Sequence, residues 1–268
     1  MKIVTWNING YRAVTGQNAS KRFDKITKDN KLFQYIEKAN YPDIIALQEI
    51  KAEPEQIMEE LRCPEGYFAY YNPSRGRKGY SGTLTLSKVE AKEVNLGIGI
   101  EKFDIEGRII ETVYNDLVHF NIYFPNGTSG DERLNYKMEF FAEFFNYVNR
   151  KYSQDSSVVI SGDYNIAHKE IDLARPKENV NNSGFLPMER DFLDKVFNEM
   201  GFIDSFRFVN PHPEQYSWWS NRGRARENNV GWRIDYNAVT QGLKSSIKHA
   251  EIQMAVPGSD HCPVILEI

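Results

Sequence analysis

Short apolar runs that end in polar residues recur along this chain, and this pattern predicts buried β-strands. In the clearest example, the apolar run that starts at Val158 leads into Gly162-Asp163-Tyr164-Asn165. Because side chains alternate along an extended backbone, Asp163 and Asn165 would point to the same side. A carboxylate beside an amide suits the binding of a phosphate or a metal-bound water, but an Asx turn that caps the strand produces the same pattern. The choice between these interpretations depends on which other residues lie at the same edge.

Six predicted strand ends carry polar residues that are able to take part in catalysis. A single acidic residue at a strand end is usually a turn former, but six such ends in one chain favour a shared site. The polar residues are Asn7, Glu49, Tyr123, Asp163 with Asn165, Asp235, and Asp260 with His261.

Apolar residues three or four positions apart predict helices between the strands. Residues 129–152 carry such a stripe, which indicates core packing, and Ser129 and Glu132 at its start have the spacing of a capping box. Further helices are expected at residues 188–200, with Gly201 at the C-terminal end, and from residue 53 through Leu61. Residues 118–124 predict a half-buried strand, residues 67–99 strands joined by turns, and residues 14–31 a surface loop or a short helix.

Length and composition indicate one soluble domain. The 268 residues contain no linker or low-complexity segment, which predicts a single domain over residues 1–268. A net charge of −4 does not favour a nucleic-acid-binding protein, although a local basic face is compatible with it. Because Cys63 and Cys262 are the only cysteines, and because no signal peptide or membrane-spanning apolar run is evident, a reducing cytoplasm is the expected location.

The residue types at the strand ends match the needs of phosphodiester hydrolysis. This reaction requires a metal that neutralises developing charge, a base for water, and donors around the phosphate. Glu49 is the preferred metal ligand, because a hard carboxylate suits Mg²⁺. Asp235 is the expected partner that fixes the tautomer of His261, whereas the adjacent Asp260 is assigned to the metal. The remaining histidines, at positions 119, 168, 212 and 249, are expected to be structural.

Seven motifs that occur in order resemble the exonuclease III family of apurinic/apyrimidinic (AP) endonucleases. They are Trp6-Asn7-Ile8-Asn9-Gly10, Leu47-Gln48-Glu49, Gly79-Tyr80-Ser81-Gly82, Tyr123-Phe124-Pro125-Asn126-Gly127, Gly162-Asp163-Tyr164-Asn165, Asn229-Val230-Gly231-Trp232-Arg233-Ile234-Asp235-Tyr236 and Ser259-Asp260-His261-Cys262-Pro263. The ordered set is specific, and the resemblance covers essentially all of the chain. It implies an α/β fold, the four-layered α/β sandwich of the endonuclease/exonuclease/phosphatase type, with two mixed sheets face to face and helices on both outer sides.

The same resemblance implies hydrolysis of the DNA backbone 5′ to an abasic site, with Mg²⁺ as cofactor and Mn²⁺ as a substitute. The products would be a 3′-hydroxyl and a 5′-deoxyribose phosphate, and 3′-to-5′ exonuclease and 3′-repair phosphodiesterase side activities are expected. The expected partner is double-stranded DNA with abasic sites, bound by a monomer that needs no membrane and no protein partner. With no extension before Met1, a compact prokaryotic enzyme of the cytoplasm is expected.

Family roles transfer to matching positions of this chain. The implied metal ligands are Glu49, Asp260 and Asn7. The implied catalytic residues are Asp163, Asn165, Tyr123, Asn7 and His261 with Asp235, and either Asp163 or His261 is the general base. The implied substrate contacts are Trp232, Trp218 and Ile234 around a flipped-out abasic sugar, Asn179 and Asn182 near sugar and phosphate, and Arg12, Lys51, Tyr80, Arg175 and the loop Arg222–Arg226 on the DNA backbone.

Two departures from the family pattern and three alternative functions stay open. The segment between Arg12 and Tyr41 is longer than usual, and residues 236–239 are more polar than usual. A phosphoinositide or sphingomyelin hydrolase would share the metal site, but the motif around Trp232 and the loop from Asn179 to Asn182 argue against it. A catalytically silent nucleic-acid-binding regulator is disfavoured by the complete set of catalytic residues. A general deoxyribonuclease would differ only in its preference for abasic over intact duplex.

Overall fold

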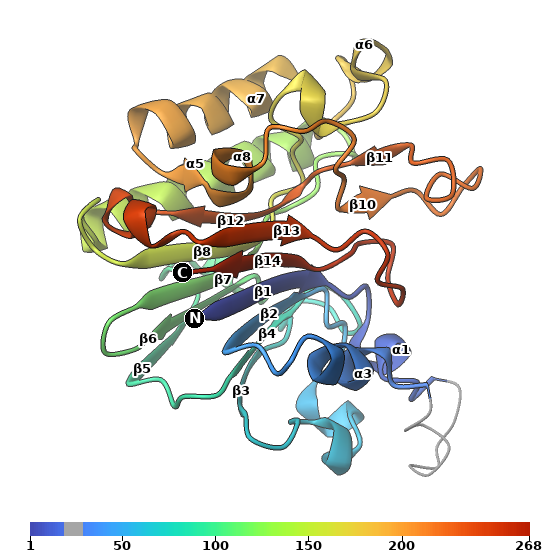
Figure 1. Cartoon of the computed structure of the whole chain (residues 1–268), viewed down its shortest axis with the longest axis vertical. Helices are drawn as coiled ribbons and strands as arrows, with labels where there is room; N and C mark the ends of the chain where they lie inside the picture. The colour runs from blue at the N-terminus through green and yellow to red at the C-terminus, as the bar shows by residue number, and fades with distance from the viewer. Residues whose placement is uncertain (19–28) are drawn as a thin grey trace.

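The computed structural model describes residues 1–18 and 29–268 and contains two β-sheets that pack face to face, with helices on both outer sides (Figure 1). Each sheet has six strands of mixed direction among the described residues. Strands of one sheet contact strands of the other, as β1 contacts β8 and β2 contacts β7. The predicted four-layered α/β sandwich is therefore confirmed.

The first sheet has the strand order β13-β14-β1-β2-β4-β3. Its central strands, β1 (Lys2–Asn7) and β2 (Ile44–Gln48), are parallel, so that Asn7 lies beside Gln48 where both strands end. The other strands are each antiparallel to a neighbour: β14 (Val264–Glu267), β13 (His249–Ile252), β4 (Thr83–Ser87) and β3 (Phe68–Asn72). Apolar residues of α1 (Tyr11–Val14) and α3 (Lys31–Lys38) join the apolar cluster of this sheet on its outer face.

The second sheet has the strand order β5-β6-β7-β8-β12-β9. Its central strands, β7 (Val118–Tyr123) and β8 (Val158–Asp163), are parallel and end together, with Tyr123 opposite Asp163. Strand β12 (Asp235–Val239) runs antiparallel to β8 and begins opposite the same residue, so Asp235 also lies beside Asp163. The outer strands are β6 (Ile109–Val113), β5 (Glu93–Leu96) and β9 (Ile203–Asp204).

Helix α5 (Asp131–Lys151) covers the outer face of the second sheet. Its phenylalanines enter the core, where Phe141 stacks on Phe124 with ring centroids 3.8 Å apart. The predicted helix at 188–200 is confirmed as α7 (Pro187–Asp194), which continues as the π-helical turn η4 (Lys195–Glu199). Gly201 follows with a φ of 82°, the conformation that favours glycine after a helix.

Short elements complete the fold. They are α4 (Glu101–Asp104), α6 (Pro176–Asn179), α8 (Ser205–Val209), the turns η1 (Pro54–Gln56), η2 (Glu59–Leu61), η3 (Glu170–Asp172) and η5 (Gln241–Ser246), and the ribbon of β10 (Trp218–Trp219) with β11 (Gly231–Trp232). In the part of the chain that the structure describes, no helix is both long and apolar enough to cross a membrane.

The layer between the two sheets contains buried polar side chains that hydrogen-bond across it. Gln48 of the first sheet donates to Asn121 of the second (Nε2–Oδ1 2.8 Å), and Asn237 of the second sheet donates to the carbonyl of Val264 in the first (Nδ2–O 3.3 Å). The expectation of a half-buried strand at residues 118–124 is therefore wrong. Both faces of β7 are buried, because α5 covers one face and the first sheet covers the other.

Two local predictions are also wrong. Helix α5 has Gly130 rather than Ser129 at its N-cap, and a glycine has no side chain that could cap the helix. The φ of Gly130 is 104°, a conformation that a residue with a side chain rarely adopts, which explains why glycine occupies this position. The expected helix from residue 53 is two separate 3₁₀ turns, η1 and η2, because Ile57 between them is extended (φ −101°, ψ 132°) and buries its side chain in the core. Of the segment 14–31, residues 19–28 lie outside the described residues.

Asp172 forms a buried ionic cluster with two arginines. It accepts hydrogen bonds on Oδ1 from Arg233 (Nε, 2.8 Å) and Arg207 (Nη2, 2.7 Å), and Arg233 also pairs with Asp204 (Nη2–Oδ2 2.7 Å). Burial opposes ionisation of Asp172, but Arg233 and Arg207 outweigh it and hold the pKa of this carboxyl below its ordinary value. The stabilisation from this carboxylate is therefore complete above about pH 4, the pKa of an unfolded aspartate, and is lost as the pH falls further.

We predict that Asp172→Asn lowers the free energy of unfolding by about 3–5 kcal/mol at pH 7, because it leaves buried arginine charges without a full partner. Urea unfolding at pH 7 measures this loss. The control is Glu227→Gln, which removes an exposed pair with Arg224 (side chains 70% and 80% exposed) and should change stability by less than about 0.5 kcal/mol. Equal stability of the two variants would contradict the prediction.

Candidate active site

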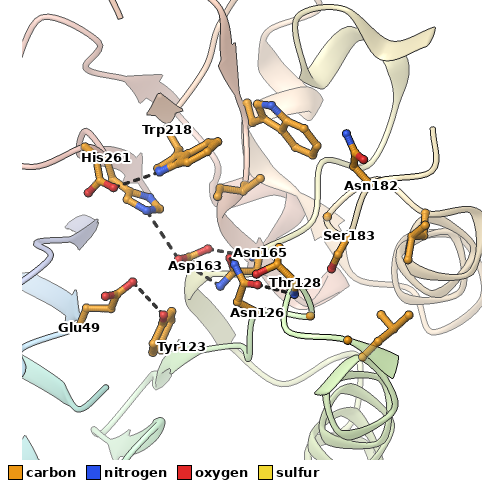
Figure 2. Close-up of a pocket in the computed structure, with 18 of the residues that line it drawn as sticks. Glu49, Tyr123, Asn126, Thr128, Asp163, Asn165, Asn182, Ser183, Trp218 and His261 are labelled. Atoms are coloured by element: carbon orange, nitrogen blue, oxygen red, sulfur yellow. Dashed lines mark hydrogen bonds and ion pairs between the residues drawn. The ribbon is translucent and has the colours of Figure 1, made fainter. Parts of the chain in front are cut away.

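The ends of two parallel strand pairs, β1 with β2 and β7 with β8, and the start of β12 bring the predicted catalytic residues together (Figure 2). Tyr123, Asp163 and Asp235 are neighbours on one rung of the second sheet. Asn7 and Glu49, at the ends of β1 and β2, face this rung from the first sheet. The Asn7 amide donates to Glu49 (Nδ2–Oε1 2.9 Å) and to Asp163 (Nδ2–Oδ2 2.9 Å), so that it joins the two sheets at the site.

Glu49 is held as a carboxylate by its surroundings. The Tyr123 hydroxyl donates to Oε1 (2.8 Å), and the Lys51 ammonium lies 2.6 Å from Oε2. Burial opposes ionisation, but Lys51 and then Asn7 outweigh it and lower the pKa of Glu49. Burial, followed by the charge of Glu49, raises the pKa of Tyr123 well above its ordinary value. Tyr123 is therefore a hydrogen-bond donor at neutral pH.

The imidazole of His261 lies between two carboxylates. Its Nδ1 is 2.9 Å from Oδ2 of Asp235, and its Nε2 is 3.9 Å from Oδ2 of Asp163. Burial opposes protonation of His261, but Asp235 and Asp163 outweigh it and raise the pKa of His261 to about 10. The ring is therefore an imidazolium at neutral pH, with Nε2–H directed toward Asp163. The prediction that Asp235 partners His261 agrees with this geometry.

Asp163 has an unusually high pKa for an aspartate. Burial is the main cause and the nearby Asp235 charge is the next, and together they raise the pKa of Asp163 to about 7, although His261 lowers it. A carboxyl group with such a pKa can take up and release a proton near neutral pH, which is what general acid–base catalysis requires.

Asn165 does not continue the strand, so the expectation that its side chain extends parallel to that of Asp163 is wrong. Its φ is 52°, and its backbone N–H donates to Asp163 (N–Oδ1 2.8 Å), which is an Asx turn. The side-chain amide of Asn165 nevertheless comes near the second oxygen of Asp163 (Nδ2–Oδ2 3.4 Å) and donates to the carbonyl of Phe124 (2.9 Å). The turn and the catalytic interpretation are therefore compatible, because the turn brings the amide back over the carboxylate.

The donor atoms at the site fit a hard divalent cation. Asp163, Asp235 and His261 each have one potential ligand atom within 4.8 Å of one another, of which a protonated His261 leaves the two carboxylates as donors to a cation. Among the residues that the structure describes, Oδ1 of Asp235 is buried without a hydrogen-bond partner. Asp260, an expected ligand, lies at the rim, where it accepts from Asn9 (Nδ2–Oδ1 2.9 Å) and Trp218 (Nε1–Oδ2 3.2 Å). Burial opposes ionisation of Asp260, but His261 and Asn9 outweigh it and lower its pKa, so it is also an anionic ligand candidate. Oxygen ligands of this kind suit Mg²⁺ or a similar ion.

A pocket of about 1180 Å³ opens beside these residues. The predicted substrate residues Trp218, Trp232, Ile234 and Asn182 line it. Trp218 and Trp232 pair across the ribbon of β10 and β11, with ring centroids 6.4 Å apart and the rings at 80°. The pocket thus combines an aromatic wall with the acidic strand ends.

Four predicted substrate residues, Arg12, Tyr80, Arg175 and Asn179, do not line this pocket. The Tyr80 hydroxyl is instead bound by Arg108 and Arg133 (both 3.0 Å), and Asn179 accepts from Asn182 (2.8 Å). Their role in contacting DNA outside the pocket stays a prediction.

The sequence did not predict the residues that form the polar side of the pocket. The missed lining residues include Asn126, Thr128, Asn181, Ser183 and Gly184. Asn126 belongs to the quoted motif that starts at Tyr123, which was a signal that this loop lies at the site, and its amide donates to Asn165 (3.4 Å). No comparable signal marks Ser183, because only the tertiary structure folds residues 181–186 over this pocket.

Comparisons with known proteins agree with these observations. Residues 4–261 match the endonuclease/exonuclease/phosphatase family. The chain is 43% identical to an exodeoxyribonuclease of Bacillus subtilis, covering 100% of this chain and 99% of that protein. It is 39% identical to a DNA-(apurinic or apyrimidinic site) endonuclease of Dictyostelium discoideum, covering 98% of this chain and 69% of that protein.

Solved structures show the same similarity. An AP endonuclease from Archaeoglobus fulgidus superimposes with a TM-score of 0.84 at 27% identity, over 99% of this chain and 98% of that chain. A 3′ phosphatase from Neisseria bound to a product DNA hairpin superimposes with a TM-score of 0.85 at 25% identity, over 100% and 99% of the two chains.

We predict that Asp235→Asn lowers the pKa of His261 in the metal-free protein, because it removes the carboxylate that contributes most to holding the proton on the ring. The ring ¹⁵N shifts of His261, followed by NMR from pH 5 to pH 11 in EDTA, should show a titration midpoint near pH 10 in the wild type and a lower midpoint in the variant. His119 is an internal control, since burial lowers its pKa to about 3 and it should remain neutral in both proteins. An unchanged titration of His261 would contradict the assigned partnership.

Proposed function

The chain belongs to the endonuclease/exonuclease/phosphatase family and is a phosphodiester-hydrolysing DNA repair nuclease, and we propose that it cuts double-stranded DNA on the 5′ side of abasic sites. One observation carries this proposal: the aromatic wall of Trp218 and Trp232 lines the same pocket as the acid–base pair of Asp163 and His261. The apolar wall suits a sugar that lacks its base, and the charged edge suits the adjacent phosphate. The names of the relatives support exonuclease and 3′-phosphatase side activities.

In the proposed mechanism, Asp163 is the general base. Its pKa of about 7 allows it to accept the proton of the attacking water, whereas His261, with a pKa of about 10, is already protonated and lacks a free acceptor nitrogen. His261 donates from Nε2 to a non-bridging phosphate oxygen, and Asp235 holds the ring in that orientation through Nδ1. The Tyr123 hydroxyl and the Asn165 amide add neutral donors on the other side of the phosphate.

A divalent cation, Mg²⁺ or Mn²⁺, completes the proposed site. Glu49 and Asp260 would hold it, with Asn7 as a neighbour, and the cation would neutralise charge that develops on the phosphate oxygens. The cluster of Asp163, Asp235 and His261 is less suited to direct ligation at neutral pH, because a protonated imidazole has no lone pair to offer.

We also propose an oligomeric state, a domain organisation and a cellular location for the enzyme. It acts as a monomer with one domain over residues 1–268, in the cytoplasm, on DNA. The relative from Bacillus subtilis, which matches this chain along essentially its full length, supports a bacterial enzyme of this kind. Arg12, Tyr80, Arg175, Asn179 and the loop Arg222–Arg226 are proposed contacts to the DNA backbone outside the pocket.

The test of this function is incision of a duplex that carries one tetrahydrofuran abasic analogue, with Mg²⁺ or with EDTA, beside an intact duplex. This analogue cannot undergo β-elimination, so a cut must be hydrolytic. We expect Mg²⁺-dependent incision 5′ to the analogue and sparing of the intact duplex. Equal cutting of both duplexes indicates a general deoxyribonuclease, and tight binding without incision indicates a silent regulator.

We predict that Asp163→Asn and His261→Ala each lower kcat on this substrate by about 10²–10³-fold or more, because each removes a group that acts on the transition state. The dissociation constant for the same duplex, measured by fluorescence anisotropy in EDTA, should change by much less, since each residue acts at the scissile phosphate alone and the other phosphate contacts along the duplex are kept. Near-wild-type turnover in either variant would refute its assigned role.

We predict that Glu49→Ala raises the Mg²⁺ concentration required for half-maximal incision, because it removes the main proposed metal carboxylate. A Mg²⁺ titration of initial rates measures this shift. Glu139→Ala, which removes an exposed carboxylate on α5 that pairs with Lys102, is the matched control and should give the wild-type curve. Identical titrations for Glu49→Ala and wild type would exclude Glu49 as a ligand.

A further inference from the structure

Helix α5 buries a lysine behind the pocket. The side chains of Lys137 and Glu189 both have 0% exposure, and their charged atoms lie 2.6 Å apart (Nζ–Oε1). Lys137 is on the face of α5 that also carries the core phenylalanines, and Glu189 is in the first turn of α7. Neither residue belongs to the proposed catalytic set. Burying such a pair is costly, and apolar residues of similar volume usually serve packing as well or better.

The pair holds two pocket segments at once. Lys137 donates from Nζ to the carbonyl of Asn165 in the turn after β8 (2.8 Å). On the other side, Oε2 of Glu189 accepts from the backbone N–H groups of Gly184 (2.6 Å) and Leu186 (3.0 Å), and Oε1 accepts from the Ser183 hydroxyl (3.1 Å). The ion pair therefore bridges the turn after β8 and the segment 181–186, which forms another wall of the pocket and is also joined to Ala167, whose backbone N–H donates to the carbonyl of Gly184 (N–O 2.8 Å).

The surrounding packing leaves these segments little freedom to move toward each other. A Cβ on Gly184 would lie 3.3 Å from the carbonyl oxygen of Asn165 and 3.2 Å from the ring of Trp232. A Cβ on Gly127 would lie 2.6 Å from the Ser183 hydroxyl and 3.4 Å from the Lys137 chain. Glycines thus allow the two segments to approach closely, and the ion pair lies between them.

We propose that Lys137 and Glu189 are positioning residues, which set the distance between the Asp163–Asn165 turn and the wall 181–186. This inference rests on the proposed function, since its consequence is catalytic. Asn165 is in a left-handed turn whose N–H is held by Asp163 and whose carbonyl is held by Lys137, so the turn is anchored on both sides. Loss of the lysine anchor frees the amide of Asn165 and the carboxylate of Asp163 to shift relative to the bound sugar. Displacements of about 1 Å at such a site can cost on the order of 10²-fold in rate.

The test variant is the double substitution Lys137→Met with Glu189→Gln. Glutamine keeps an acceptor for the N–H groups of Gly184 and Leu186, and methionine fills the space of the lysine chain, so no unpaired charge stays buried. The matched control is Lys151→Met, which removes another ion pair between α5 and a buried glutamate, Glu111 (2.8 Å), about 21 Å further along the same helix. Lys137→Arg, which keeps a cationic donor, is the conservative variant.

We expect the double variant to lose at least 10-fold in kcat on the tetrahydrofuran duplex, with KM within about threefold of wild type. Lys137→Arg should retain more activity than the double variant, and Lys151→Met should keep the wild-type kcat. Hydrogen exchange of the Asn165 backbone N–H, measured by NMR without substrate, should accelerate at least 10-fold in the double variant and not in Lys151→Met. If the Lys137–Glu189 pair contributed only to stability, both the double variant and Lys151→Met would have lower urea midpoints. The double variant would then show neither the selective loss of kcat nor the selective acceleration of Asn165 exchange.

A folded double variant with kcat and Asn165 exchange like those of wild type would overturn the inference. If wild type itself does not incise the duplex, the proposed function fails, and the exchange measurement still decides whether the pair anchors the turn. If the double variant does not fold, Glu189→Asp decides instead, because it keeps the charge but shortens the side chain by one methylene, so that the carboxylate no longer reaches Lys137 and the N–H groups of Gly184 and Leu186 together. We then expect at least a 10-fold loss of kcat and faster exchange of the N–H groups of Gly184 and Leu186, and wild-type values would overturn the inference.

Discussion

The Asn7 side-chain amide, which donates to Glu49 of its own sheet and to Asp163 of the facing sheet, is the interaction on which this site depends. It brings two carboxylates within reach of one donor at the contact between two buried sheets. Like charges this close in a poorly solvated place are unfavourable unless cations balance them. Lys51 and His261 supply part of that balance, and the proposed divalent cation supplies the rest.

The charges around this site shift the pKa values of Asp163 and Glu49 in opposite directions. Asp163 is buried beside Asp235 and shares the His261 cation with it, so its pKa rises to about 7. Burial opposes ionisation of Glu49, but the adjacent Lys51 and the hydrogen bond from Asn7 outweigh it, so the pKa of Glu49 falls. Two carboxylates at neighbouring strand ends thus differ in proton affinity because of their surroundings, and only one of them is suited to act as a base at neutral pH.

Buried polar side chains between the two sheets are hydrogen-bonded to each other, and this polar layer lies next to the charged site. Gln48 with Asn121, and Asn237 with the carbonyl of Val264, join the two sheets by hydrogen bonds in the layer between them. These directional contacts fix how the sheets are placed on each other more tightly than apolar packing alone does. The Lys137–Glu189 pair is a second set of directional contacts, which joins the turn at Asn165 to the pocket wall 181–186.

Hydrophobic periodicity in the amino-acid sequence determined the strands and the polar residues at their ends, because it is a local property of the chain, and the ordered motifs determined the fold class through the family resemblance. The residue types at the strand ends predicted the His261–Asp235 pair, and the family resemblance predicted the aromatic wall of Trp218 and Trp232. Only the tertiary structure decided that both faces of β7 are buried, because the alternation of side chains along one strand does not show whether a second layer covers its polar face. It alone placed Ser183 in the pocket and paired Lys137 with Glu189, 52 residues apart in the chain, because buried ion pairs follow from the packing of helices and have no local sequence pattern.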